Sequence, residues 1–330
     1  MKNHQITVIP GLILSLAIAA AGYALGRLVP MVGGAVFSIL LGILIASLWK
    51  RPDAFDSGIR FTSKIILQAA VILLGFEMNI ANVLAVGKQS LWVILITLTT
   101  AFVTVLLVGR LFKVSRKLSV LIGVGTAICG GSAIAAASPA IDAKDEDISY
   151  SISTIFLFNV IAVFIFPPLG RLLGLSDAGF GMWAGTAIND TSSVVAASFA
   201  YSDVAGGFAT IVKLTRSLMI VPITLVLAIL YARMKKGSNT FSFAKVFPWF
   251  VVGFIAAAIL RSVGVIPVEL AQNLTWLGKF LIMTAMAAIG LNTNLRTFIT
   301  AGPRALALGG LTWLAVMVSS LAVQLAGNLW

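Results

Sequence analysis

Lys213, Arg216 and Asp190 are the residues whose type and position point most clearly to chemistry. All three lie inside long apolar segments, where an ionisable side chain is costly and a functional role is the first interpretation. Counted inward from Asp203, Asp190 and Arg216 each lie about 20 Å deep and Lys213 about 15 Å deep at the helical rise per residue. The similar depths predict a pocket with two cations and one carboxylate, which favours an anionic ligand.

A repeated motif supplies further candidate ligands. GTAICGGSAIAAAS, from Gly125 to Ser138, is similar to GTAINDTSSVVAAS, from Gly185 to Ser198. Adjacent glycines weaken a helix, so we expect a break whose free N–H groups and positive helix dipole face an anion. Close helix packing by small residues is the alternative. The predicted substrate-binding residues are Lys213, Arg216, Gly130, Gly131, Ser132, Asn189, Thr191 and Ser192.

The acidic residues have more than one interpretation. We predict that Asp190 carries a coupling proton or balances charge, and Glu77 is a second ion-coupling candidate. Glu77 lies nearer the outer surface, where solvation by lipid headgroups is the simpler interpretation. Asp190 could instead form a structural ion pair. Lys213 could serve in structural pairing or in proton coupling, because a desolvated lysine loses its proton more readily.

The elements that must position these residues are membrane helices. The chain has 330 residues, of which 59% are hydrophobic and 10% charged, whereas soluble domains carry about 25% charged residues. Each crossing needs about 20 apolar residues plus a turn, which predicts about eleven transmembrane helices in an all-α polytopic membrane protein. Connections are short, so residues 1–330 are expected to form a single membrane domain. The expected helices centre near Ile18, Ile39, Ile72, Thr100, Ile128, Val160, Ser192, Pro222, Ala256, Ala285 and Val316.

The distribution of positive charge predicts the orientation. With a cytoplasmic N-terminus, fifteen of the 23 Lys and Arg residues lie inside, as expected for loops that are retained in the cytoplasm. Outside would lie Arg27, Lys88, Lys144 and Arg261. We therefore expect a cytoplasmic N-terminus and an external C-terminus. The net charge of +12 then reflects topology rather than a nucleic-acid partner.

Several classes of chemistry are disfavoured by what the chain contains. The single Cys129 and the single His4 provide no Cys and His cluster, so we expect neither a metal site nor a cofactor. No nucleotide-binding loop is visible, which disfavours ATP as the driver. No Ser-, Cys- or His-based catalytic arrangement can be assembled, so an enzyme is not expected.

A second internal similarity has a different spacing. A shift of 215 residues aligns Lys64 with Lys279 and Gly75 with Gly290. These two helices are an odd number of crossings apart, as in the inverted repeats of secondary transporters. The GTAI segments are an even number of crossings apart and would be parallel. One duplication cannot explain both relations, so both interpretations stay open.

The segments GTAICGGSAIAA, GTAINDTSSVVAA and VKLTRSLMIVP resemble the YeiH family of bacterial inner-membrane proteins, whose family name refers to sulfate export. The resemblance covers nearly the whole chain. It implies the cation/proton antiporter and bile-acid transporter clan, with inverted repeats, interrupted helices in a core domain, a scaffold interleaved with it in sequence, and commonly a homodimer. The clan's cation antiporters carry a tandem acidic pair, whereas this chain has Asn189 and Asp190 at the similar segment.

These observations together predict a secondary active transporter of a small anion. Sulfate or an organosulfonate, moved by alternating access in the inner membrane and coupled to H⁺ or Na⁺, is the leading hypothesis. A monovalent cation/proton antiporter that binds its cation at Asp190 is the alternative.

Overall fold

The computed structural model describes residues 2–28, 34–49, 51–234, 249–293 and 302–330. Within these ranges every regular element is helical. Seven segments of the described chain are long and apolar enough to cross a membrane, and two shorter apolar helices accompany them. The predicted all-α membrane architecture is confirmed at this level, and the count of eleven crossings stays a prediction.

The contacts divide the chain into two compact units, each assembled from separate stretches of sequence. Unit 1 comprises Met1–Ala85, Val195–Gly207 and Trp249–Leu295. Unit 2 comprises Val86–Val194, Phe208–Pro248 and Arg296–Trp330.

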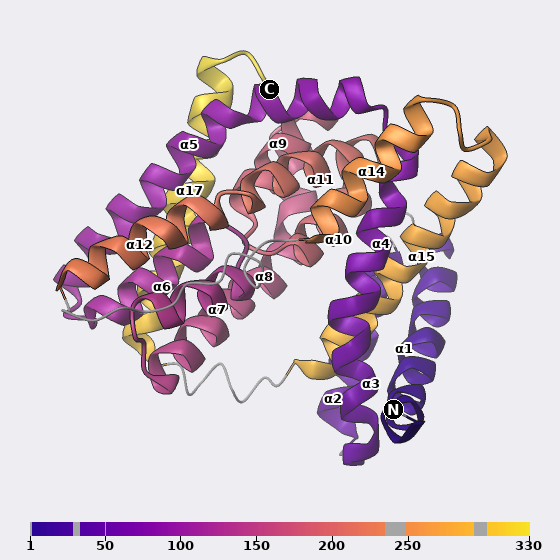
Figure 1. The fold of residues 1–330 in the computed structure, drawn as a ribbon, viewed down its shortest axis with the longest axis horizontal. Helices are drawn as coiled ribbons and strands as arrows, with labels where there is room; N and C mark the ends of the chain where they lie inside the picture. Colours follow the sequence, from indigo (N-terminus) through magenta and orange to yellow (C-terminus); the bar gives the residue numbers. More distant parts are fainter. Residues whose placement is uncertain (1, 29–33, 50, 235–248, 294–301) are drawn as a thin grey trace. The chain divides into compact units, whose positions relative to one another are not determined.

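Unit 1 is built around one long helix, α15 (Val268–Asn292), which packs against α1 (Lys2–Leu28), α2 (Gly34–Leu48) and α4 (Leu67–Leu74) (Figure 1). The other elements of the unit are η1 (Asp53–Phe55), α3 (Asp56–Phe61), the π-helical turn η2 (Thr62–Ile66), η3 (Gly75–Glu77) and α14 (Trp249–Ser262).

Glycine permits the close approach of α2 and α15. A Cβ atom at Gly42 would lie 2.9 Å from the Cα atom of Gly290, and one at Gly290 would lie 3.0 Å from the Cα atom of Gly42. Small residues allow such backbone contact between membrane helices, where apolar surface alone does not drive association.

Unit 2 contains the first repeated segment and the first ten residues, 185–194, of the second. Its helices are α5 (Ile80–Leu111, whose first residues belong to unit 1), α6 (Arg116–Ala127), α7 (Gly131–Ala140), α8 (Asp145–Leu172), α9 (Asp177–Ala187), α12 (Ile220–Met234) and α17 (Pro303–Ala326). Helix α6 packs against α7, α8 and α17, and α17 packs against α8 and α9 (Figure 1).

Two further helices are shared between the units. Helix α10 (Thr191–Tyr201) begins in unit 2 and ends in unit 1, and α11 (Asp203–Ser217) begins in unit 1 and ends in unit 2. Asp190, directly before α10, lies in unit 2 together with Lys213 and Arg216 at the end of α11.

Candidate functional site

The two GTAI segments are interrupted at equivalent positions. Helix α6 ends at Ala127 and α7 begins at Gly131, while α9 ends at Ala187 and α10 begins at Thr191. Each boundary in the second segment lies 60 residues after its counterpart, the same shift that aligns the sequences. The predicted break is therefore present in both copies, and we refer to residues 128–130 as break 1 and residues 188–190 as break 2.

Local backbone geometry explains why the helices stop there. Gly130 has φ 70° and ψ −132°, a conformation open to glycine and strained for residues with a Cβ atom. In break 2, Ile188 is extended, with φ −85° and ψ 136°. Both preceding helices start with a serine cap: the Ser115 hydroxyl accepts from the Leu118 N–H and the Ser176 hydroxyl from the Gly179 N–H.

Lys213 joins the carbonyl ends of both interrupted helices. Its buried Nζ donates to the carbonyl oxygens of Ile128 at 2.8 Å, Ile188 at 2.9 Å and Asn189 at 2.5 Å. An ammonium group has three N–H donors, so these bonds use its whole capacity. Cations are stabilised at helix C-termini, where unpaired carbonyls concentrate negative charge.

Arg216 contacts the same two helix ends one turn further along α11. Its Nε donates to the carbonyl of Ala127 at 2.6 Å, Nη2 donates to that of Thr126 at 2.7 Å, and Nη1 donates to that of Thr186. The guanidinium is fully buried. The flat fork of arginine suits several carbonyls at once. Lys213 and Arg216 therefore bind carbonyls at equivalent positions of the two GTAI segments.

A tryptophan completes the end of α9. The indole Nε1 of Trp313 donates to the carbonyl of Ala187 at 3.1 Å, so the four consecutive carbonyls of residues 186–189 all accept hydrogen bonds from buried side chains. Trp183 fixes the other side of α9 by stacking on Phe166, with ring centroids 4.2 Å apart. Protein donors therefore satisfy these carbonyls at the end of α9 and in break 2, as buried backbone groups require.

Asp190 caps the start of α10. Its carboxylate accepts from the Ser193 N–H at 2.7 Å, the Ser192 hydroxyl at 2.5 Å and the Ser193 hydroxyl at 3.2 Å. An aspartate at this position satisfies a free N–H and is favoured by the positive end of the helix dipole. The carboxylate is therefore already engaged at its own helix.

The two breaks face each other through Gly130 and Asp190. A Cβ atom placed on Gly130 would lie 3.2 Å from Cβ of Asp190 and 3.7 Å from Nδ2 of Asn159. Asn159 is 3% exposed, and its Oδ1 accepts from the Asp190 N–H at 3.3 Å. Sequence reasoning missed Asn159, although an amide in the apolar run FLFNVIAVFIF is itself a functional signal in a membrane helix.

Asn189, in break 2, has an unsatisfied side chain. Its side chain is fully buried, and within the described part of the chain neither Oδ1 nor Nδ2 has a hydrogen-bond partner. A buried carboxamide without partners is costly unless a ligand or water completes it.

The remaining predicted ligands in unit 2 are more accessible. Ser132 is exposed, Gly131 and Thr191 are half-buried, and Ser192 is buried against Asp190. No neighbouring atom would lie within 4 Å of a Cβ placed on Gly131. The start of α7 therefore has open space beside it.

Glu77 lies in unit 1 rather than in the unit of the two breaks. It forms an ion pair of 3.4 Å with Lys279, whose Nζ also lies 2.9 Å from Asp203. The Lys279 ammonium lies 5.2 Å from the centroid of the Phe199 ring. Glu77 thus has an ion-pair partner, Lys279, in its own unit.

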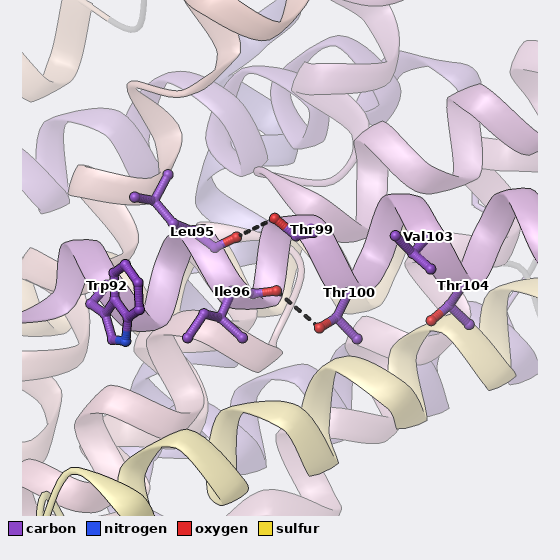
Figure 2. A pocket seen from close by; sticks show the side chains of 7 residues that line it. All are labelled: Trp92, Leu95, Ile96, Thr99, Thr100, Val103 and Thr104. Atoms are coloured by element: carbon purple, nitrogen blue, oxygen red, sulfur yellow. Dashed lines mark hydrogen bonds between the residues drawn. The ribbon is translucent and has the colours of Figure 1, made fainter.

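A surface groove on α5 differs in character from the two breaks. Figure 2 shows its lining residues, which are Trp92, Leu95, Ile96, Thr99, Thr100, Val103 and Thr104. The hydroxyls of Thr99 and Thr100 donate to the carbonyls of Leu95 at 2.8 Å and Ile96 at 2.9 Å in the same helix. Because these hydroxyls are engaged and the other lining side chains are mostly apolar, we assign the groove no role in binding an ion.

Among the described residues, no group of three or more His, Cys, Asp or Glu side chains could hold a metal.

Similar proteins cover nearly the whole chain. Residues 10–309 match the family described as "Conserved hypothetical protein 698". A UPF0324 membrane protein from Streptococcus agalactiae serotype V is 45% identical over 98% of both chains, and one from Streptococcus pyogenes serotype M6 is 46% identical over 100% of both. A third, from Fusobacterium nucleatum, is 45% identical over 95% of this chain and 96% of its own. These names describe membrane proteins and state no substrate.

Proposed function

Because this chain belongs to the YeiH family of multi-pass membrane proteins, whose curated relatives are named UPF0324 membrane proteins, we propose that it is a secondary active transporter of a small anion. Sulfate is the substrate that the YeiH family name suggests, and the excess of buried cations favours sulfate or an organosulfonate. The substrate would bind where break 1 and break 2 meet and would reach each side of the membrane in turn by movement of a core bundle against a scaffold.

The charge balance at the breaks is the observation that carries the proposal. At the two breaks, α6 and α9 end with free backbone carbonyls, and α7 and α10 begin with free backbone N–H groups. The buried cations Lys213 and Arg216 donate hydrogen bonds to the carbonyls at the ends of both α6 and α9. The Asp190 carboxylate accepts from a free N–H at the start of α10. The formal charge of these three side chains therefore sums to +1, and the start of α7 has no side-chain cap. A bound anion supplies the missing negative charge.

Lys213 and Arg216 act on this anion through charge rather than through contact. The Lys213 ammonium has no donor left over in this conformation, and the Arg216 side chain is directed to carbonyls. Direct ligands come from the Gly131 and Ser132 region of α7 and from the unsatisfied carboxamide of Asn189. The low dielectric around the buried cations strengthens their attraction for an anion that is not in contact with them.

The membrane setting follows from the same proposal. We place the protein in the bacterial inner membrane, with a cytoplasmic N-terminus and an external C-terminus, because most Lys and Arg residues then lie inside. Asp190 is the group we assign to coupling with H⁺ or Na⁺, and a homodimer is the expected assembly.

Substitutions at Gly131 test the anion site without disturbing its packing, because nothing lies within 4 Å of a Cβ at this position. Gly131→Asp places a carboxylate at the start of α7, where it is favourable for folding, and Gly131→Asn has the same shape without charge. We expect purified wild-type protein and Gly131→Asn to bind radiolabelled sulfate and Gly131→Asp to bind it about tenfold more weakly or worse. Equal binding by the two variants would refute the anion site at α7.

The cation alternative predicts a different pattern in proteoliposomes. If a Na⁺ or K⁺ gradient moves protons without any substrate anion, and Asp190→Asn abolishes this flux, the protein is a cation/proton antiporter. The anion proposal expects no such flux. The Asp190 carboxylate accepts hydrogen bonds from Ser192 and Ser193 in this conformation, so any cation bound there would compete with these donors.

A further inference from the structure

Asn159 is a buried polar residue that the sequence analysis did not place in the site. It lies near the middle of α8, and its side chain is 3% exposed in a largely apolar stretch. An amide at this depth is unfavourable unless its polar atoms are engaged. The groups that the Asn159 oxygen and nitrogen face therefore indicate the role of the side chain.

One end of the Asn159 carboxamide is fixed by break 2. The atom that faces the Asp190 N–H must be an acceptor, so it is Oδ1, at 3.3 Å. The amide nitrogen then lies on the side of break 1, 3.7 Å from the Cβ position of Gly130. A single side chain thus presents its acceptor to one break and its donors to the other.

From this geometry we propose that Asn159 determines the sign of the ion that the site accepts, by presenting amide donors at break 1. The inference rests on the proposed function and deepens it. N–H donors stabilise an anion beside Gly130 and repel a cation. The rest of the site sums to +1, from Lys213 and Arg216 against Asp190, so a neutral amide preserves this excess. A carboxylate in place of Asn159 cancels it.

Asn159→Asp isolates this role, because it keeps the acceptor for the Asp190 N–H and replaces the donor end with an oxygen. Thr154→Val is the matched control: Thr154 lies on the same helix, is fully buried, and its hydroxyl has no hydrogen-bond partner within the described structure. We expect Asn159→Asp to weaken binding of radiolabelled sulfate by about tenfold or more and Thr154→Val to leave it unchanged. Wild-type affinity in Asn159→Asp overturns the inference.

A second readout does not depend on sulfate. Cys129, the single cysteine of the chain, precedes Gly130 and is partly accessible. A carboxylate introduced at Asn159 should repel the reactive thiolate and slow alkylation by N-ethylmaleimide by about threefold or more. Thr154→Val should react at the wild-type rate. An unchanged rate in Asn159→Asp would show that the donor end does not face break 1.

The two measurements separate the inference from the proposed function. If wild-type protein does not bind sulfate but Asn159→Asp slows alkylation, the sulfate assignment fails and the placement of Asn159 holds. If wild-type protein binds sulfate and Asn159→Asp binds it equally, the sulfate assignment holds and the inference about Asn159 fails. Thermal unfolding of each variant establishes that it is folded. Should Asn159→Asp not fold, Asn159→Ser, which removes the amide donors without adding charge, takes its place and should weaken sulfate binding while Thr154→Val does not.

Discussion

Lys213→Met tests whether the buried lysine holds the two breaks together. The substitution removes three hydrogen bonds, to the carbonyls of Ile128, Ile188 and Asn189. A buried carbonyl left without a partner costs about 1–3 kcal/mol, and part of the total is regained because no ammonium must be desolvated. Three such carbonyls, less the desolvation that is regained, give an expected loss of about 3–5 kcal/mol in the free energy of unfolding.

The assay is thermal unfolding of the purified protein in detergent, with Lys64→Met as control. Lys64 is exposed, and substitutions at such positions change stability by about 0.5 kcal/mol or less. A loss of about 3–5 kcal/mol should lower the melting temperature on the order of 10 °C. If Lys213→Met melts with the wild type and loses only sulfate binding, Lys213 is a direct substrate ligand and its assignment to the helix ends is wrong.

Three further outcomes are expected. Asp190→Asn should leave the melting temperature within a few degrees of the wild type, because Asn is as good a helix cap as Asp, and should strengthen sulfate binding, because the site becomes more positive. Lys279→Met should cost about 1 kcal/mol or less in thermal unfolding, since its ion pair with Asp203 is solvent-accessible. Gly42→Leu should prevent folding of unit 1 or lower its melting temperature sharply, because even a Cβ atom would lie 2.9 Å from the Cα atom of Gly290; a normal melting curve would contradict the observed contact.

The charged residues of the site could be found from the sequence because their types are rare in apolar segments. Lys213, Arg216 and Asp190 stand out by the cost of placing them in a membrane. The breaks were predictable for the same reason: Gly130 and the repeated GTAI segments do not suit a continuous lipid-facing helix. These inferences use residue identity and spacing, which a single sequence contains.

The partners of those residues could not be found in this way. Lys213 and Arg216 bind backbone carbonyls, and every residue type has a carbonyl, so the sequence contains no signal for which one is used. Asn159 lies 31 residues from Asp190 along the chain, and their contact depends on how α8 packs. Glu77 was considered beside Asp190 because both are acidic, but its ion pair with Lys279 joins residues 202 positions apart.

The difference between the two repeats at one position explains why the site is asymmetric. Gly130 occupies in the first repeat the position that Asp190 occupies in the second. An aspartate at Gly130 would have to adopt φ 70° and ψ −132° and would place its Cβ atom 3.2 Å from that of Asp190, so strain, crowding and charge repulsion all oppose a second carboxylate attached to the chain. In both repeats the first helix ends at carbonyls that are bound by Lys213 and Arg216. The start of α10 has its own carboxylate, Asp190, whereas the start of α7 has open space. A mobile anion can enter and leave that space, whereas an attached carboxylate cannot.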